Sequence, residues 1–368
     1  MNKQKPTLKE ILICVIFIGF ISTFAVLNQV VPQPAVLVSE RRIPAKFPEL
    51  TLATITSGEF MSGFDSYASD RFVFRDTFRM LNAFQVFDIY IQTDKSGLYR
   101  CNAVGLGEFK HIDATSFRQT AQRIQRAAAH VAESDMNIYF SIVPDKSIYA
   151  ERYYPGFDMA EAESIILDVL KDYEYVKLTE TLSAEMFYKT DLHWDQSKIS
   201  AVTNRLLSAM NADPRQTTFP TINVGDWKGV YAGQYALPFT PDIMTCVDIP
   251  GLSVKYLNDK TFEFDDGPLY DVDRFNGIDP YDIFLRGPQP LIIIENPAVP
   301  ERELYLFRDS FGSSLAPLMA QAYSKITIID LRYINLQILD MFFEFTPGSD
   351  VLFIYSSQIF NNPSIIQA

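Results

Sequence analysis

Two short motifs contain the residue types that nucleophilic acyl transfer requires. Residues 191–194 read Asp-Leu-His-Trp, so the carboxylate of Asp191 precedes the imidazole of His193 by two positions. Residues 309–312 read Asp-Ser-Phe-Gly and place Ser310 after an apolar run. An alcohol, a base that takes its proton and a carboxylate that orients the base are the parts of an activated serine. The chain has only 3 histidines, so finding one in such a motif favours chemistry over coincidence.

Each motif also has a structural explanation. Asp309 or Ser310 could be the N-cap of a helix that follows. Asp191 could likewise cap the next helix, although Asp195 is an alternative cap. A serine at a helix start nevertheless has a chemical use, because the N–H groups there point toward any anion that forms beside them. Metal binding by Asp191 and His193 would need a further ligand, and no Cys/His spacing typical of a metal site occurs. We therefore predict no metal and no cofactor.

The elements that must position these residues follow from apolar runs. Strands are expected at 137–143, 291–294, 304–307, 326–329 and 351–355, and helices at 116–133, 159–172, 196–210, 312–323 and 334–343. This alternation predicts an α/β fold with a mostly parallel sheet covered on both faces. Active sites of such sheets lie beyond the carboxyl ends of the strands, where Ser310 is placed. Residues 59–368 are predicted to form this domain, with 211–290 as an irregular insertion of loops and hairpins.

Charge and composition limit the partners. Hydrophobic residues make up 48% and charged residues 21% of the 368 residues, which is typical of a folded protein. The formal charge of −13 argues against a nucleic-acid partner, since phosphate binding needs a basic surface. A strongly anionic polymer is disfavoured for the same reason, unless a local basic cleft overrides the mean.

The N-terminal segment contains an uncharged apolar run, 11–27, preceded by three lysines. A retained membrane anchor, a cleaved signal peptide and a buried core helix are the alternatives. The anchor is favoured because small residues suited to cleavage are scarce at 27–35. We predict a cytoplasmic tail (1–10), a single-pass transmembrane anchor (11–31) and a proline-rich stalk (32–58), with the domain outside the cytoplasm. There Cys101 and Cys246 could form a disulfide or remain two thiols.

Several sequence blocks resemble a known family. From about residue 60 onward the chain is similar to the DHHW proteins and to the related AlgX/AlgJ-type SGNH-hydrolase-like domains of polysaccharide O-acetylation systems. The blocks that carry the resemblance are 70–76, 143–146, 191–194, 281–285, 309–310 and 329–333. The resemblance implies a flavodoxin-like three-layer sandwich in which Ser310 is the nucleophile, His193 the general base and Asp191 the residue that orients it. This chain departs from the Asp-His-His-Trp motif that gives the family its name at Leu192, where a histidine would be expected.

Two further residues are candidates for binding substrate or a developing oxyanion. Arg332 could do so, or could instead form a salt bridge with Asp330. Asn296 could donate to an oxyanion, although the sequence Asn-Pro at 296–297 is also a turn signal.

The resemblance implies a membrane-anchored, extracytoplasmic serine acyltransferase that O-acetylates a cell-envelope or secreted polysaccharide. Its acyl donor would come from a multi-pass membrane O-acyltransferase. Two alternatives remain open. One is a carbohydrate acetylesterase, in which water resolves the acyl-enzyme, and the other is a non-catalytic glycan-binding or assembly protein with the same fold.

Overall fold

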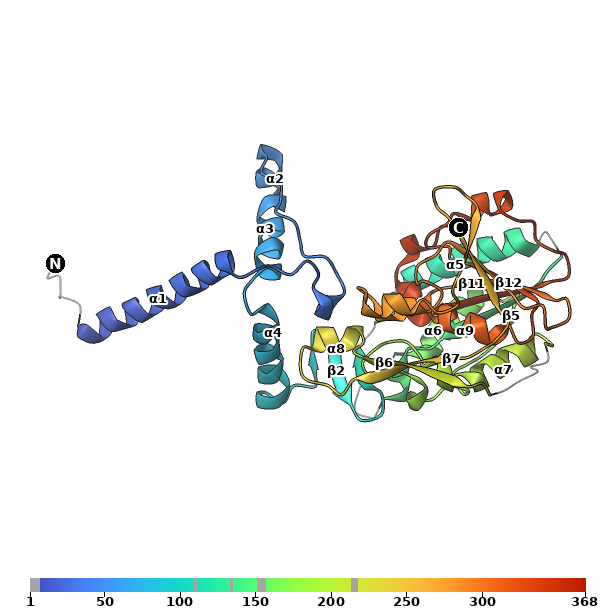
Figure 1. The fold of residues 1–368 in the computed structure, drawn as a ribbon, viewed down its shortest axis with the longest axis horizontal. Coiled ribbons are helices and arrows are strands. Elements are labelled where there is room, and N and C mark those ends of the chain that lie inside the picture. The colour runs from blue at the N-terminus through green and yellow to red at the C-terminus, as the bar shows by residue number, and fades with distance from the viewer. Residues whose placement is uncertain (1–6, 109–110, 133–134, 151–156, 213–217) are drawn as a thin grey trace. The chain divides into compact units, whose positions relative to one another are not determined.

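The computed structural model describes residues 7–108, 111–132, 135–150, 157–212 and 218–368. These form two compact units, Met1–Ile91 and Gln92–Ala368 (Figure 1). The boundary therefore falls after Ile91, whereas the sequence placed it at 58/59. Residues 59–91 belong with the N-terminal unit because they contact it directly. For example, the Arg42 guanidinium donates to both carboxylate oxygens of Asp70, at 2.6 and 2.5 Å.

The regular elements of the N-terminal unit, in its described part, are all helices. Thr7 caps the first helix, α1, through a reciprocal bond with Glu10. By its length of 23 residues and its composition, this helix is long and apolar enough to cross a membrane, as the predicted anchor requires. The elements of this unit are α1 (Leu8–Val30), η1 (Val38–Glu40), α2 (Leu52–Ser57), α3 (Glu59–Asp70), α4 (Arg75–Phe84) and η2 (Gln85–Ile89).

The C-terminal unit is built on an 8-stranded sheet with the strand order β5-β4-β13-β11-β12-β10-β8-β9. The first five strands in this order are mutually parallel, which confirms the predicted mostly parallel sheet. They are β5 (Glu174–Tyr175), β4 (Asn137–Val143), β13 (Asp350–Ser356), β11 (Glu303–Arg308) and β12 (Lys325–Ile329). The other three, β10 (Leu291–Glu295), β8 (Ser253–Leu257) and β9 (Phe264–Gly267), are antiparallel to their neighbours.

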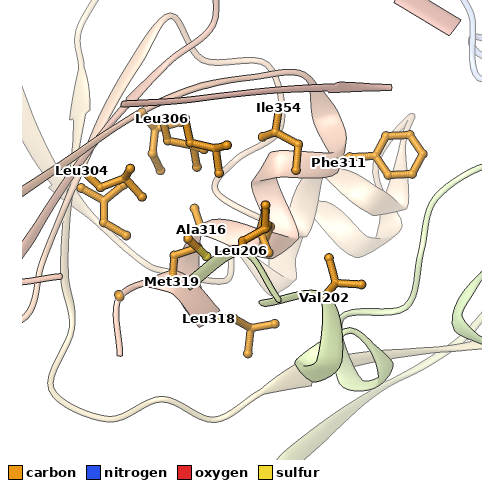
Figure 2. Close-up of a cluster of buried hydrophobic side chains, with 14 of the residues drawn as sticks. Val202, Leu206, Leu304, Leu306, Phe311, Ala316, Leu318, Met319 and Ile354 are labelled. Atoms are coloured by element: carbon orange, nitrogen blue, oxygen red, sulfur yellow. The ribbon is translucent and has the colours of Figure 1, made fainter. Parts of the chain in front are cut away.

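Helices cover both faces of this sheet, as predicted. Along β11, Leu304 and Leu306 point to one face and Tyr305 and Phe307 to the other, because strand side chains alternate. The first face packs against α7 (Ser200–Ala209) and α9 (Ser310–Met319), as the leucines and α9 residues in Figure 2 show. The second packs against α5 (Ala114–Ala132) and α6 (Met159–Val169). The result is a three-layer α/β sandwich.

The region predicted as an insertion, 211–290, is only partly one. Strands β6 (Thr221–Trp227) and β7 (Asp242–Val247) form a separate hairpin, with α8 (Val230–Tyr235) between them in the chain. Strands β8 and β9, however, extend the main sheet. A small sheet of β1 (Asp94–Lys95), β2 (Leu98–Cys101) and β3 (Gly105–Glu108) precedes α5. Cys101 and Cys246 are both buried free thiols, so the disulfide alternative is wrong.

Two predicted helices are replaced, in part or entirely, by 3-10 turns. Residues 196–198 form a 3-10 turn, η5 (Gln196–Lys198), before α7 begins, and 336–341 form another, η8 (Leu336–Met341). The remaining 3-10 turns are η3 (Lys146–Tyr149), η4 (Ala184–Met186), η6 (Val272–Asn276), η7 (Pro280–Ile283), η9 (Ser357–Asn361) and η10 (Pro363–Ile365).

Candidate active site

Ser310 is the first residue of α9, and only Asp309 separates it from the end of β11. Asp309 is the N-cap, and its Oδ1 accepts from the Phe311 N–H at 3.0 Å. Its Oδ2 accepts from the Ser356 N–H at the end of β13, at 2.8 Å. Because Asp309 caps the helix, the hydroxyl of Ser310 is available for another partner. Ser310 is also partly exposed, whereas Asp309 is buried.

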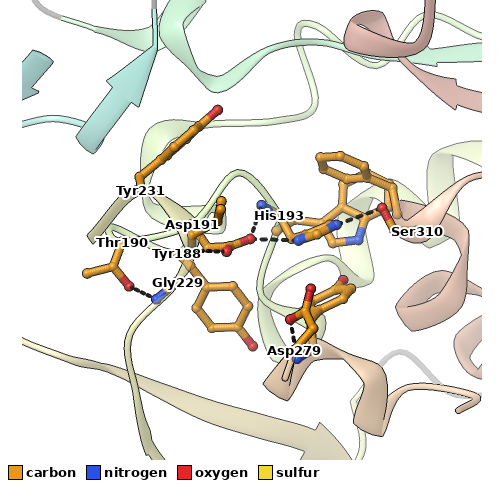
Figure 3. Close-up of polar contacts among 12 residues, drawn as sticks. Tyr188, Thr190, Asp191, His193, Gly229, Tyr231, Asp279 and Ser310 are labelled. Carbon is orange, nitrogen blue, oxygen red and sulfur yellow. Dashed lines mark hydrogen bonds and ion pairs between the residues drawn. The ribbon is translucent and has the colours of Figure 1, made fainter. Parts of the chain in front are cut away.

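The Ser310 hydroxyl contacts His193, which in turn contacts Asp191 (Figure 3). The distance from Ser310 Oγ to His193 Nε2 is 2.8 Å, and that from His193 Nδ1 to Asp191 Oδ1 is 2.6 Å. The structure thus brings together the three residues predicted from the two motifs. His193 and Ser310 are 117 positions apart in sequence. His193 and Asp191 are almost completely buried. A carboxylate that accepts a hydrogen bond from Nδ1–H favours the tautomer whose Nε2 can accept a proton from a serine.

Backbone contacts fix the Asp191 carboxylate. Its Oδ1 also accepts from the His193 N–H at 3.1 Å, and its Oδ2 accepts from the Val230 N–H, at the start of α8, at 2.8 Å. The preceding residue, Gly229, lies against Asp191 so closely that a Cβ built on it would be 2.3 Å from the Asp191 Cβ. Only glycine allows this approach. The region after residue 211 therefore supports the site.

An aromatic and hydroxyl network holds the other side of His193. The Tyr281 ring stacks on the imidazole, with centroids 3.8 Å apart and planes at 9°. The Tyr281 hydroxyl and the Trp194 Nε1 each lie 2.8 Å from Ser314 Oγ, one helical turn after Ser310. Ser314 Oγ can then donate to the Phe311 carbonyl at 3.3 Å. Burial raises the pKa of Tyr281 well above its usual value, so it remains a neutral donor.

A buried lysine lies beneath the loop that carries Asp191. The Lys146 Nζ donates to the backbone carbonyls of Asp191 at 2.7 Å, Tyr188 at 2.9 Å and Val104 at 3.1 Å. Burial lowers the pKa of Lys146 to about 8. Three carbonyl acceptors around one ammonium satisfy its donors, since a lysine has three N–H groups and no acceptor.

The two candidate substrate-binding residues have other partners. The Arg332 Nε and Nη2 donate to Asp330 Oδ1 and Oδ2 at 2.8 and 2.7 Å, which is the salt bridge considered above. Asn296 Nδ2 donates to the Ala320 carbonyl, and its Oδ1 accepts from the Ala298 N–H. Glu295 pairs with Lys325 at the start of β12. Asn296 therefore lies near the amino ends of the parallel strands, whereas Ser310 lies beyond their carboxyl ends. Asn296 cannot donate to an oxyanion beside Ser310.

Sequence reasoning missed Tyr281, Ser314, Gly229 and Lys146 as parts of the site. Two of them, Tyr281 and Lys146, lie in blocks that carried the family resemblance, but their contacts are with residues distant in the chain. Among the described residues, no group of three His, Cys, Asp or Glu side chains could hold a metal ion.

The fold and these contacts define an SGNH-hydrolase-like α/β domain with a serine, histidine and aspartate in hydrogen-bonded series. No protein-family model matches the sequence, and a search of curated proteins finds no match. Solved structures do match. A DHHW family protein from Eubacterium siraeum is similar with a TM-score of 0.58 and 18% identity, covering 74% of this chain and 94% of its own.

Bacillus cereus PatB1 is also similar, with a TM-score of 0.54 and 17% identity over 74% of this chain and 99% of that one. A structure of PatB1 with a sulfonyl adduct gives a TM-score of 0.55 and 15% identity, over 71% of this chain and 94% of that one. The chain therefore has the fold of these proteins, and the predicted resemblance to DHHW proteins is confirmed at that level.

Proposed function

We propose that this chain is a membrane-anchored serine acyltransferase that transfers acetyl groups to hydroxyls of a polysaccharide outside the cytoplasm. The observation that carries the proposal is the series Ser310–His193–Asp191, with bonds of 2.8 and 2.6 Å. Residues from two separate parts of the chain meet in the arrangement that activates a serine. A purely structural role would not require a partly exposed serine on a buried imidazole.

The geometry suits a two-step transfer. Ser310 Oγ attacks the carbonyl carbon of the acyl donor while His193 Nε2 takes the hydroxyl proton. The tetrahedral intermediate collapses, the bond to the donor's leaving group breaks, and His193 returns the proton to that group. A sugar hydroxyl then attacks the acyl-serine, His193 takes its proton, and the ester passes to the sugar as Ser310 regains a hydrogen. Asp191 remains ionised throughout and stabilises the imidazolium.

The N-terminus of α9 supplies part of the electrostatic stabilisation. Backbone N–H groups at a helix start favour an adjacent negative charge. An oxyanion formed on the carbonyl attacked by Ser310 would develop beside this helix start. Asp309 occupies the Phe311 N–H, so the Ser310 N–H is the donor of α9 that we assign to the oxyanion.

The location and the donor are part of the same proposal. The apolar helix α1 would anchor the chain, and the lysine-rich residues before it would remain in the cytoplasm. The acyl group would reach Ser310 from a multi-pass membrane O-acyltransferase, as the family resemblance implies. Water in place of the sugar would make the same site a carbohydrate acetylesterase.

The test is covalent labelling of the full chain in detergent micelles, measured by intact mass and peptide mapping. 4-Nitrophenyl acetate and an aryl sulfonyl fluoride serve as probes. We expect one adduct on Ser310, absent from Ser310→Ala and strongly slowed in His193→Ala. Ser313→Ala, a buried serine on the same helix, is the matched control and should label normally. A folded wild-type chain without adduct would reject the enzyme and favour a glycan-binding role.

A second measurement separates the two enzymes. A soluble oligosaccharide is added to the chain acetylated on Ser310, and acetylation of the sugar is compared with release of free acetate. Predominant acetylation of the sugar supports the transferase. Release of acetate at a rate that the sugar does not change supports the esterase.

A further inference from the structure

Helix α4 of the N-terminal unit is amphipathic, and its polar side, rather than its apolar side, faces the rest of the unit. Its polar side carries Arg75 and Arg79, and both guanidinium groups form ion pairs with Glu40 of η1. Ser39 donates to Asp76 on the same helix. All three charged groups of the pairs, Arg75, Arg79 and Glu40, are largely covered. The polar side of α4 therefore packs against protein.

The apolar side of α4 is left exposed. It carries large side chains at helical spacing, and their exposed fractions are 42% for Phe78, 54% for Leu81 and 48% for Phe84. The N-cap residue of the helix, Phe74, is 57% exposed. In a helix that packs onto a water-soluble core, this stripe would be the buried side. Exposed apolar patches that are contiguous mark a surface that something apolar covers.

Contacts with α1 indicate what covers this surface. The ring of Phe24, within α1, lies 5.6 Å from the Phe72 ring and 5.8 Å from the Phe78 ring between centroids. The Val73 N–H donates to Asn28 Oδ1 at 2.7 Å. The start of α4 is thus attached to the C-terminal third of α1 (Figure 1).

The depth of these contacts can be estimated from helix geometry. Phe24 precedes the last residue of α1, Val30, by six positions, which is about 9 Å along the helix axis at 1.5 Å per residue. The hydrocarbon core of a bilayer is about 30 Å thick, and a 23-residue helix is slightly longer than that. If α1 crosses the bilayer, Phe24 lies among acyl chains, and Phe72 and Phe78 lie beside it.

We propose that α4 lies in the membrane–water interface at the C-terminal end of α1, with Phe74, Phe78, Leu81 and Phe84 inserted among lipid acyl chains. This proposal rests on the membrane anchor of the proposed function and goes beyond it. The lipid covers the apolar side, while Glu40 and Asp76 together neutralise Arg75 and Arg79 so that the two arginines need no lipid headgroup. An interfacial helix of this kind binds by its buried apolar area.

The test uses the full chain reconstituted alone into phosphatidylcholine–phosphatidylglycerol vesicles. Single nitroxide labels are placed at Leu81→Cys, at Asn82→Cys and at Ile18→Cys, in a Cys14→Ser background in which the other cysteines are buried. Asn82 is the matched control, because it is exposed, adjacent to Leu81 and on the polar side of the helix. Ile18 reports on the anchor itself. Collisions with oxygen, which is enriched in lipid, and with a water-soluble nickel chelate are measured by electron paramagnetic resonance.

The expected result is a label at 81 that collides with oxygen in preference to nickel, and a several-fold stronger nickel effect at 82. Phe84→Cys, on the same side, should repeat the result for 81 if the label itself does not disturb the helix. Equal nickel access at 81 and 82, with 18 still in lipid, overturns the interfacial helix and leaves the anchor intact. Water access at 18 as well overturns both. Protection of 81 in native membranes but not in these vesicles also overturns the proposal and assigns the surface to a protein partner.

Discussion

The imidazole of His193 stacks face to face on the phenol ring of Tyr281, with ring centroids 3.8 Å apart. The Tyr281 hydroxyl in turn reaches Ser314 Oγ on α9 at 2.8 Å. The proposed base is therefore fixed on one ring face by a residue bonded to the helix that carries the proposed nucleophile. This links the orientation of the imidazole to the position of Ser310.

Replacing Tyr281 by leucine should lower the rate of acylation with 4-nitrophenyl acetate. An aromatic pair contributes about 0.5–1.5 kcal/mol beyond burial, so a loss of roughly tenfold is the expected upper range. Tyr281→Phe keeps the stack and loses only the bond to Ser314, so its rate should lie between those of Tyr281→Leu and wild type. Stopped-flow measurement of 4-nitrophenol release gives the rates. A phenylalanine variant as slow as the leucine variant would show that the hydroxyl, and not the stack, matters.

Asp191→Asn should reduce acylation far more. The asparagine has one carbonyl oxygen, whereas the two oxygens of Asp191 now accept from the Val230 N–H, the His193 backbone N–H and the His193 Nδ1–H. If the amide group faces His193, it stabilises the wrong tautomer. By analogy with serine hydrolases, the fall is about 10³–10⁴-fold. The same stopped-flow assay measures the fall, and thermal unfolding checks the fold. A loss below tenfold in folded protein would remove Asp191 from the mechanism.

Lys146→Met should slow acylation, although Lys146 binds backbone carbonyls and not the side chains of the proposed reaction. It leaves three backbone carbonyls without the N–H donors that now bind them, and unsatisfied buried acceptors are costly, at about 1–3 kcal/mol each. The loop at 188–191 should loosen, so kcat falls while KM for the small ester stays nearly constant. Lys255→Met removes a surface ion pair with Glu295 and is the control, with little effect expected. A change confined to KM would contradict this positioning role.

The N-terminal unit should lose stability in acid through Asp70. Hydrogen bonds from Arg42 hold the pKa of Asp70 down at about 2, below its usual 3.8. Because the pKa is lower in the folded state, the stabilisation is fully present above pH 4 and is lost as the pH falls through 2. Pepsin cleavage within 41–50, a segment held to Asp70 by the Ala45 N–H, reports this loss.

Asp70→Asn provides the reference for that experiment. At pH 4 the wild-type chain should be cleaved more slowly than the variant, and at pH 2 the two rates should converge. The ratio of rates removes the pH dependence of the protease itself. A ratio that stays constant from pH 4 to pH 2 would mean that the Asp70–Arg42 pair does not stabilise this segment.

Strand positions could be read from the sequence because each buried strand is a short apolar run. The run at 137–143 matches β4 to the residue, and the run at 304–307 lies within β11. The direction of a strand is not encoded in such a run. β10 was expected among parallel strands, but it is antiparallel to β12. Because of this reversal, Asn296 lies at the opposite end of the strands from Ser310 and cannot be an oxyanion donor.

The spatial meeting of the two motifs could be proposed from residue types, whereas the surrounding contacts could not. Asp191 and His193 are close in sequence, and Ser310 follows a strand, so chemistry suggested their association. The stack of Tyr281 on His193 depends on how the region after residue 211 folds back, which no local pattern encodes. For Arg332 the residue types allowed either substrate binding or a salt bridge with Asp330, and the structure contains the salt bridge.

The place of β13 in the sheet has a consequence for biosynthesis. This strand, the last along the chain, lies between β4 and β11. Lys146, which holds the loop of Asp191, follows β4, and Ser310 follows β11. A ribosome must therefore have released residues 350–356 before the two halves of the site can be joined. Until then a nascent chain carries Asp191, His193 and Ser310 without their mutual alignment, so the proposed activation of the serine requires residues 350–356 to have left the ribosome.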